Sequence, residues 1–467
     1  MGRLFGTDGI RGIANIEITC ELAMNIGRAV SLVLRKQNKD KAKVLIGKDT
    51  RLSSDMLEGA LTAGLCSVGA DVVILGVVPT PAVAYLVKEY QADAGIMISA
   101  SHNPYEFNGI KVFCKDGYKL PDCMEDEIEN ILSRDSKTIN YPENYKVGKV
   151  IKKDTATDDY IEHIKSTIEG DLKGLKVAFD CSNGSASRTA EKLFKSLGVK
   201  CHMLNNNPNG ININKDCGSV HIGALSRFVK DNNFDLGIAF DGDADRCLAI
   251  DENGRVIDGD FIMAICAQYL KSNGRLAKDT VVGTVMTNMG FNKFCSENKL
   301  NFISTKVGDR YVLEAMLKNG YNFGGEQSGH IIFLDFATTG DGQLTAVQLL
   351  KIVKEKNKKF SEISNIMKKY PQVMLNVEVS KDGKEKFPYD KVVTDAIEDV
   401  KRRFTKNDKN SISRELIDDV TAGATGRILV RASGTEPLVR VMLEGEDENE
   451  IMTMADSVAQ VIRNRLV

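Results

Sequence analysis

The 467-residue sequence predicts an α/β protein with three related α/β domains, each with a mainly parallel mixed sheet, and a smaller α+β domain at the C-terminus. Three observations predict this fold class. The chain is too long for a single hydrophobic core. An apolar run, a helical segment and a second apolar run recur three times, which is typical of βαβ units in a largely parallel sheet. The C-terminal part follows a different order of elements.

The three repeats cover 43–76, 176–204 and 280–305. In each one, an apolar run rich in β-branched residues leads through a helical segment into another apolar run. In the first repeat, we expect Ser53 or Ser54 to cap the helix. Sequence identity between the repeats is slight, so their relationship rests on the pattern of elements.

The C-terminal part predicts a β-α-β-β-α order. Apolar residues alternate from Val373 to Val379, as in a strand with one buried face, and a helix is expected over about 386–403. Two strands flank RASGTEP (431–437), and a final amphipathic helix follows. We expect domains at 1–153, 154–252, 253–369 and 370–467, with linkers at 134–154 and around 366–371.

Composition narrows the class of partner and the cellular location. The formal net charge of −2 and the absence of long basic runs argue against nucleic acid as the main partner. The N-terminus does not resemble a signal peptide, and no uncharged run is long enough to span a membrane. The ten cysteines are scattered and are expected to be reduced core residues. We therefore expect a cytoplasmic protein with a small-molecule ligand.

A serine loop follows the apolar strand GIMIS, in the segment ISASHNP (98–104). Loops at the carboxyl ends of parallel strands are where α/β proteins bind ligands. Ser101 could carry a phosphoryl group, with His102 beside it and Lys111 a little later in the sequence. Ser99 is the competing hydroxyl, and an ordinary polar turn is the alternative interpretation.

An aspartate loop, DGDADR (241–246), follows the strand DLGIAF. If this loop is extended, the two-residue period places Asp241, Asp243 and Asp245 on one side. Three carboxylates about 5 Å apart repel by roughly 3 kcal/mol per pair at an effective dielectric near 20, so a cation is expected among them. Oxygen ligands at short spacing favour Mg²⁺ over zinc. Arg246 could balance charge on a transferring group, and a solvated acidic turn is the alternative.

The segment GEQSGH (325–330) places an acid, a hydroxyl and an imidazole between glycines. Glu326 can accept hydrogen bonds, while Ser328 and His330 can donate or accept them. This set suits the hydroxyl and amine groups of a sugar. A hairpin-like turn between the flanking apolar runs is the alternative.

The segment RASGTEP offers a guanidinium fork, hydroxyls and a glycine where backbone N–H groups can approach a phosphate. The candidate phosphate-binding residues of this loop and the strand after it are Arg431, Ser433, Gly434, Thr435 and Arg440. An ordinary serine-glycine turn is the alternative. In GTDGIRG (6–12), Arg11 is a further candidate anion ligand.

Together, SASHNP, DGDADR, GEQSGH and RASGTEP resemble the phosphoserine, metal, sugar and phosphate loops of the α-D-phosphohexomutase superfamily over nearly the whole chain. Four matches in the same order are highly specific. Within the superfamily, the opening GRLFGTDGIRG, the glutamine of GEQSGH and VGDRYV (307–312) are similar to the bacterial phosphoglucosamine mutase branch. Phosphomannomutase/phosphoglucomutase relatives typically have methionine in the sugar loop and histidine near Asp309, so these departures count against that branch.

The resemblance implies four domains around a central cleft, with one loop from each domain. It implies that Ser101 is phosphorylated and that its phosphate shares one Mg²⁺ per chain with the three aspartates. Glu326 and Ser328 would read the sugar hydroxyls, and the C-terminal loop would hold the non-reacting phosphate. The residues left for charge balance and proton transfer are Arg11, His102, Lys111, Arg246 and His330, with Lys111 as our choice of general acid/base.

The implied reaction interconverts glucosamine 6-phosphate and glucosamine 1-phosphate through a 1,6-bisphosphate. It would supply UDP-N-acetylglucosamine and cell-wall synthesis, with glucosamine or glucose 1,6-bisphosphate as activator. A phosphosugar is the expected partner, without nucleic acid or membrane, and a homodimer is left open. The alternatives are a phosphomannomutase/phosphoglucomutase, a metal-dependent phosphatase that uses the same serine, and a non-catalytic phosphosugar-binding protein.

Overall fold

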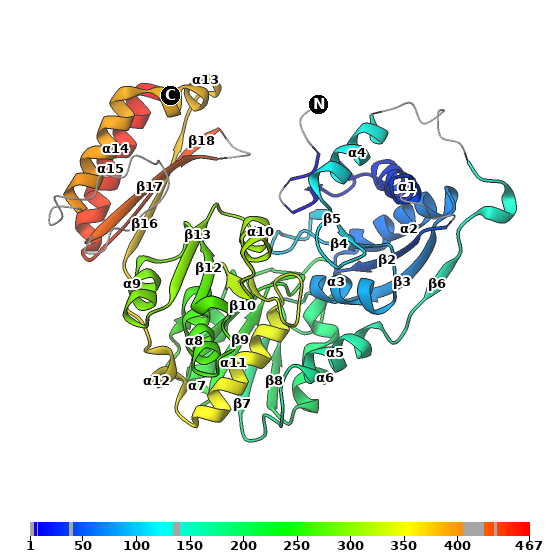
Figure 1. Ribbon diagram of the computed structural model, residues 1–467, viewed down its shortest axis with the longest axis horizontal. Helices are drawn as coiled ribbons and strands as arrows, with labels where there is room; N and C mark the ends of the chain where they lie inside the picture. The colour runs from blue at the N-terminus through cyan, green and yellow to red at the C-terminus, as the bar shows by residue number, and fades with distance from the viewer. Residues whose placement is uncertain (1–3, 7, 37–40, 134–140, 405–424, 434–436) are drawn as a thin grey trace. The chain divides into compact units, whose positions relative to one another are not determined.

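The structure is a computed structural model that describes residues 4–6, 8–36, 41–133, 141–404, 425–433 and 437–467 (Figure 1). The chain divides into two compact units. Unit 1 comprises Met1–Thr284 and Thr305–Ile366, and unit 2 comprises Val285–Ser304 and Met367–Val467.

Unit 1 begins with a mixed six-stranded sheet in the order β1-β5-β4-β2-β3-β6. Its strands are β1 (Ile10–Ile13), β2 (Lys43–Lys48), β3 (Asp71–Val77), β4 (Ala94–Ile98), β5 (Phe107–Cys114) and β6 (Val150–Lys152). The helices of this part are α1 (Cys20–Lys36), α2 (Leu52–Ser67), α3 (Thr80–Glu89) and α4 (Asp122–Leu132). Strands β2 and β3 are parallel, as the first predicted βαβ repeat requires. Strand β6 lies within the expected linker 134–154 and pairs with β3.

The core of this first part forms because apolar residues recur at helical spacing. In α1, Ala23, Ile26, Val30 and Val33 are all at most 1% exposed and belong to a core that includes the sheet strands. The expected serine cap of α2 is wrong. Arg51 is the N-cap residue and makes no side-chain cap hydrogen bond. The side chain of Ser54 instead donates to Asp49, because it lies within the first turn and faces that buried carboxylate.

The second part of unit 1 has a five-stranded sheet in the order β11-β10-β9-β7-β8. Its strands are β7 (Lys176–Asp180), β8 (Lys200–Leu204), β9 (Leu236–Phe240), β10 (Cys247–Asp251) and β11 (Val256–Ile257). Its helices are α5 (Ala156–Ser166), η3 (Ser185–Arg188), α6 (Ala190–Ser196) and α7 (Gly223–Asp231). Strands β7 and β8 are parallel, which agrees with the second predicted repeat. The antiparallel pair β9–β10 forms a hairpin whose connection is the aspartate loop.

In the third part of unit 1, β12 (Thr280–Thr284), β14 (Phe323–Gly325) and β15 (Ile331–Phe333) lie side by side in one sheet. The helices are α8 (Gly259–Ser272), η4 (Ala277–Asp279), α10 (Asp309–Asn319), α11 (Gly342–Lys356) and α12 (Phe360–Ser364). Helix α11 is buried over most of its length. Asp341 caps it by accepting from the Leu344 N–H.

Unit 2 contains a three-stranded antiparallel sheet in the order β16-β18-β17. Its elements are α9 (Met289–Glu297), most of β13 (Asn301–Thr305), β16 (Gln372–Glu378), α13 (Lys381–Lys386), η5 (Phe387–Tyr389), α14 (Lys391–Phe404), β17 (Gly426–Ala432), β18 (Leu438–Gly445) and α15 (Glu448–Leu466). The helix expected over 386–403 begins later, at Lys391. The predicted fold class, three α/β domains and a smaller α+β C-terminal domain, is confirmed. None of the helices in the described part of the chain has the length and apolar character needed to cross a bilayer.

Candidate active site

The serine loop begins where β4 ends. Ser101 is 1% exposed and has a φ of 51°, in the left-handed region that non-glycine residues rarely adopt. Its Oγ donates to Asp241 Oδ2 at 2.7 Å, across 140 positions of sequence. Ser99, the competing hydroxyl, donates to Asp49 at 2.7 Å and accepts from the Ser101 N–H at 3.0 Å. The structure therefore brings Ser101 to the aspartate loop and directs Ser99 elsewhere.

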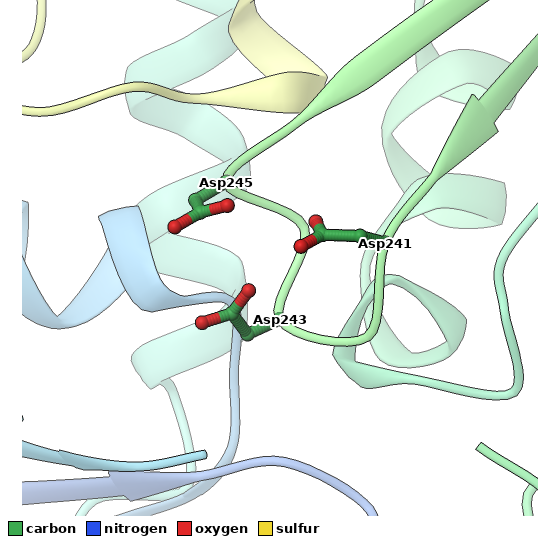
Figure 2. Close-up of side chains that lie close together, drawn as sticks. All are labelled: Asp241, Asp243 and Asp245. Carbon is green, nitrogen blue, oxygen red and sulfur yellow. The ribbon is translucent and has the colours of Figure 1, made fainter. Parts of the chain in front are cut away.

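The aspartate loop brings its three carboxylates together at the tip of the β9–β10 hairpin. Asp241, Asp243 and Asp245 are all buried, and one oxygen from each lies within 4.8 Å of the others. Figure 2 shows the three side chains pointing toward a common space. The loop is not extended, because Gly242 and Asp243 form a turn and Ala244 has a φ of 56°. The carboxylates converge because the chain curls around them.

These donors fit a hard divalent cation. Asp243 Oδ1 and Asp245 Oδ1 are buried with no hydrogen-bond partner in the part of the chain that the structure describes. Burial, followed by the charges of Asp245 and Asp243, raises the pKa of Asp241 well above its usual value. An all-oxygen set of carboxylates with open lone pairs suits Mg²⁺. Asp241, Asp243 and Asp245 would hold the ion, with an oxygen on Ser101 within reach.

Thr80 supports this loop and was not found from the sequence. It is the first residue of α3, and its Oγ1 donates to Asp243 Oδ2 at 2.6 Å. Its backbone N–H also donates to the Asp243 carbonyl at 2.9 Å. Both contacts fix the middle aspartate in place. Threonine at the start of a helix is common in any protein, so no sequence signal distinguished it.

Lys111 reaches the same carboxylates from β5. Its Nζ lies 2.8 Å from Asp243 Oδ2 and 3.6 Å from Asp245 Oδ2. Although burial lowers the pKa of Lys111, the charges of Asp243, Asp8 and Asp245 raise it above its usual value. In this arrangement Lys111 is a buried cation that offsets the carboxylates. The expected role as general acid/base stays a prediction, and it requires release of these ion pairs.

A chain of ion pairs extends from Lys111 and includes residues that sequence reasoning did not assign. Lys111 Nζ is 3.0 Å from Asp8, and Lys119 Nζ is 2.6 Å from Asp8 and 2.5 Å from Asp309. Arg11, expected to bind an anion, pairs with Asp8. The segments GTDGIRG and VGDRYV contained Asp8 and Asp309, but nothing in the sequence indicated that Lys119 joins them.

His102 and Arg246 contact each other beside Ser101. The Arg246 guanidinium donates to His102 Nδ1 at 2.8 Å. Burial, followed by the charges of Arg246 and Arg11, lowers the pKa of His102 to about 4. His102 is therefore a neutral acceptor at physiological pH. Burial lowers the pKa of Arg246, but Asp245 and Asp241 raise it above its usual value, so it supplies a permanent positive charge.

The sugar-loop candidates lie in the hairpin connection between β14 and β15, so the hairpin alternative correctly describes the backbone. Glu326 is half-buried and accepts from the Gly308 N–H at 3.2 Å. Burial raises the pKa of this carboxyl. Ser328 lies in the same connection and is exposed.

His330 links this loop to the metal loop. Its Nδ1 is 3.7 Å from Asp245 and its Nε2 is 3.6 Å from Asp309. Burial lowers the pKa of His330, but Asp245, Asp309 and Glu326 raise it to about 9. The Gly340 N–H points at Nε2 from 3.0 Å, so a fully protonated ring must exchange that hydrogen bond for the pairing with Asp309.

The phosphate-loop candidates belong to unit 2. Arg431 is the second-last residue of β17 and lies directly opposite Arg440 of β18 in the antiparallel register. Burial and the charge of Arg440 lower the pKa of Arg431. Like charges placed opposite each other are unfavourable unless an anion compensates them, so this pair suits a phosphate. Ser433 is 4% exposed, and Gly434 and Thr435 lie outside the described residues.

Comparison with models of protein families shows to which family this chain belongs. Models of the phosphoglucomutase/phosphomannomutase family match residues 2–138 (alpha/beta/alpha domain I), 158–254 (domain II), 258–370 (domain III) and 374–461 (C-terminal domain). The chain belongs to the phosphoglucomutase/phosphomannomutase family. The domain boundaries expected from the sequence stay predictions.

Comparison with curated relatives shows which branch of the family this chain resembles. The chain is 52% identical over 466 residues to a phosphoglucosamine mutase of Acetivibrio thermocellus, covering 100% of both chains. It is also 52% identical over 465 residues to a phosphoglucosamine mutase of Clostridium acetobutylicum, again over 100% of both. The resemblance to this branch of the superfamily is therefore confirmed.

Solved structures share the fold at low identity. A phosphoglucomutase/phosphomannomutase family protein of Burkholderia thailandensis aligns with a TM-score of 0.79 at 23% identity, covering 99% of this chain and 97% of that one. An N-acetylphosphoglucosamine mutase of Aspergillus fumigatus, solved with GlcNAc-6P and magnesium, aligns with a TM-score of 0.67 at 18% identity, covering 99% and 96%. These two likenesses support the fold.

Proposed function

We propose that this chain is a phosphoglucosamine mutase that interconverts glucosamine 6-phosphate and glucosamine 1-phosphate. The observation that carries the proposal is the 2.7 Å hydrogen bond from Ser101 Oγ to Asp241, inside a buried group of three carboxylates. A hydroxyl and an oxygen-only cation site in contact are what metal-assisted phosphoryl transfer requires. Full-length relatives named phosphoglucosamine mutase support the choice of sugar.

In the proposed reaction, phosphorylated Ser101 donates its phosphoryl group to the free O1 or O6 of the bound monophosphate. The P–O bond to Ser101 breaks and a P–O bond to the sugar forms, while the sugar hydroxyl loses a proton and the Ser101 oxygen gains one. The resulting 1,6-bisphosphate turns over, and its other phosphoryl group returns to Ser101. Mg²⁺ held by Asp241, Asp243 and Asp245 would neutralise charge that develops on the phosphoryl oxygens. Arg246 and Lys111 supply fixed positive charge beside the same group.

The substrate is read at two places in this proposal. Glu326 and Ser328 would bind the sugar hydroxyls, because one can accept hydrogen bonds and the other can donate them. Arg431, Ser433 and Arg440, with Gly434 and Thr435, would hold the phosphate that is not reacting. The placement of Arg431 directly opposite Arg440 supports this assignment, because two guanidinium groups close together suit a phosphate.

The proposal includes several finer points. Glucosamine or glucose 1,6-bisphosphate would act as activator by phosphorylating Ser101. The product would supply UDP-N-acetylglucosamine and cell-wall synthesis in the cytoplasm. Whether the enzyme is a homodimer is a matter for measurement of its mass in solution.

The deciding experiment is a mutase assay with glucosamine 6-phosphate and Mg²⁺, primed with glucose 1,6-bisphosphate. We expect glucosamine 1-phosphate as product, with little free phosphate. Parallel assays with glucose and mannose phosphates test the alternative hexose specificity through kcat/KM. If free phosphate is the main product, the chain is a phosphatase and the proposal is wrong.

A further inference from the structure

We infer that Arg51 and Asn214 are positioning residues that hold the backbone of Ser101 so that its Oγ faces the metal loop. This inference rests on the proposed function, because it concerns the serine that carries the phosphoryl group. Both side chains are buried, at 2% and 5% exposure. Both donate to the same two carbonyl oxygens, those of Ser101 and Asn103.

Arg51 approaches the serine loop from the start of α2. Its Nη2 donates to the Ser101 carbonyl at 3.0 Å and to the Asn103 carbonyl at 2.9 Å. Its Nη1 donates to the Phe107 carbonyl at 3.0 Å and to the Pro104 carbonyl. One rigid guanidinium thus gathers four carbonyls of the loop that carries the nucleophile. Lysine cannot reproduce this pattern, because its donors radiate from a single atom at the end of a flexible stem.

Asn214 reaches the same carbonyls from the segment between β8 and α7. Its Nδ2 lies 2.9 Å from the Ser101 carbonyl oxygen and 2.9 Å from that of Asn103. A Cβ added to Gly242 would lie 2.5 Å from the Ser101 carbonyl oxygen and 2.8 Å from Asn214 Nδ2. The backbone of the metal loop therefore packs directly against this carbonyl. The position of the Ser101 carbonyl therefore depends on the position of the loop that carries the aspartates.

The N–H of Ser101 is held as well. It donates to Ser99 Oγ at 3.0 Å, and Ser99 donates to Asp49 at 2.7 Å. Arg51 Nε donates to the same carboxylate at 2.8 Å. Asp49 thus links the two halves of the support, and it orients Arg51 while fixing Ser99.

This support explains how Ser101 keeps an unfavourable conformation. A φ of 51° costs energy for a residue with a Cβ. Such a conformation persists where several surrounding contacts hold the backbone in place. If the carbonyl is released, the backbone can relax toward negative φ and turn Oγ away from Asp241. The side chains of Arg51 and Asn214 donate to Asp49, to the serine loop and to the start of β5, so their loss is expected to act on turnover.

Asn214→Gly is the sharpest test. Asn214 has a φ of 58°, which glycine adopts freely, so the substitution removes the two donated hydrogen bonds without adding backbone strain. Asn357→Gly is the matched control, because Asn357 has a φ of 48° at the end of α11, outside the site. Both purified variants are assayed for mutase kcat and KM, for melting temperature, and for phosphate on Ser101 by intact mass.

We expect kcat of Asn214→Gly to fall roughly 10- to 100-fold, as small misplacements of reacting groups do, with KM within about three-fold of wild type. Phosphate on Ser101 after priming should fall as well, while Asn357→Gly keeps wild-type values. Arg51→Lys retains the charge opposite Asp49 and should lose at least as much turnover. If Arg51→Lys does not fold, Asn214→Gly alone decides.

Wild-type kcat and phosphorylation in folded Asn214→Gly, beside an active wild type, would overturn the positioning role and leave the proposed function intact. A rise in KM with unchanged kcat would also overturn it, because it would mean that Asn214 acts on substrate binding. An inactive wild-type protein would overturn the proposed function itself, and the inference with it.

Discussion

Two buried groups of charged residues lie on either side of Ser101, and they differ in how their charges are satisfied. In the first, Asp49 accepts from Arg51, Ser54 and Ser99, and the side chains of Asp49 and Arg51 are both 0% exposed. In the second, Asp243 and Asp245 each have a buried oxygen without a hydrogen-bond partner, within the described part of the chain. Both groups are equally buried, so burial does not distinguish them.

The difference shows which group is built to take a ligand. A buried ion pair with every lone pair used is internally complete, and breaking it leaves an uncompensated charge. Three carboxylates that share a small space are unfavourable unless a cation joins them. The raised pKa of Asp241, caused by burial and then by Asp245 and Asp243, expresses that cost. The Asp49 group supports the serine, and the Asp241 group is open to a metal.

The largest effect is expected at the residue between the two groups. Ser101→Ala should lower mutase activity by at least about 10³-fold, because it removes the atom that would carry the phosphoryl group. The fold should be retained, as measured by circular dichroism and by a melting temperature close to that of the wild type without Mg²⁺. Turnover at the wild-type rate in the folded variant would show that another group is the nucleophile.

Removal of the metal should affect the Asp241 group and leave the Asp49 group unchanged. Chelation of Mg²⁺ is expected to abolish activity, and Mg²⁺ at about 100 times its Kd should stabilise the wild-type protein by about 2.7 kcal/mol. Asp243→Asn should lose most of this thermal shift and at least about 10²-fold in activity, because it removes charge from the cation site. A full Mg²⁺ shift in Asp243→Asn would contradict the assignment of the metal to these carboxylates.

In the Asp49 group, Asp49→Asn is the variant that corresponds to Asp243→Asn in the Asp241 group. It leaves Arg51 without its counter-charge and should destabilise the protein by about 3 kcal/mol, seen as a lower apparent melting temperature. The Mg²⁺-induced shift should remain, because the three aspartates are unchanged. Equal loss of the Mg²⁺ response in Asp49→Asn and Asp243→Asn would mean that the two groups do not act separately.

The smallest effect concerns a half-buried histidine outside both groups. His163 of α5 stacks on Tyr85, with ring centroids 3.9 Å apart, and burial lowers its pKa below the usual value. The unfolded chain then takes up a proton that the folded chain does not, so stability falls as pH drops below about 6.5, by up to about 1.4 kcal/mol per pH unit.

His163→Phe keeps an aromatic ring against Tyr85 and removes this titration. Melting temperatures measured from pH 7.5 to pH 5 should fall less steeply for the variant than for wild type. An identical slope in the two proteins would show that His163 takes up its proton equally in the folded state.

Local sequence determined the βαβ repeats, the α+β order of the C-terminal part and the loops that carry Ser101 and the three aspartates. These features are readable because hydrophobic periodicity and turn residues act over a few positions. The aspartates converge as expected, although through a curled turn with Ala244 at positive φ. An alternating strand pattern does not reveal such a turn.

Only the tertiary structure decided which distant groups meet. Asp8, Lys119 and Asp309 form one chain of ion pairs, and Arg51 and Asn214 both donate to the carbonyl of Ser101. These residues are widely separated in sequence, and each has an ordinary local context. Their roles depend on how the three sheets of unit 1 and their helices pack. This packing brings together charged and amide side chains that no short segment contains.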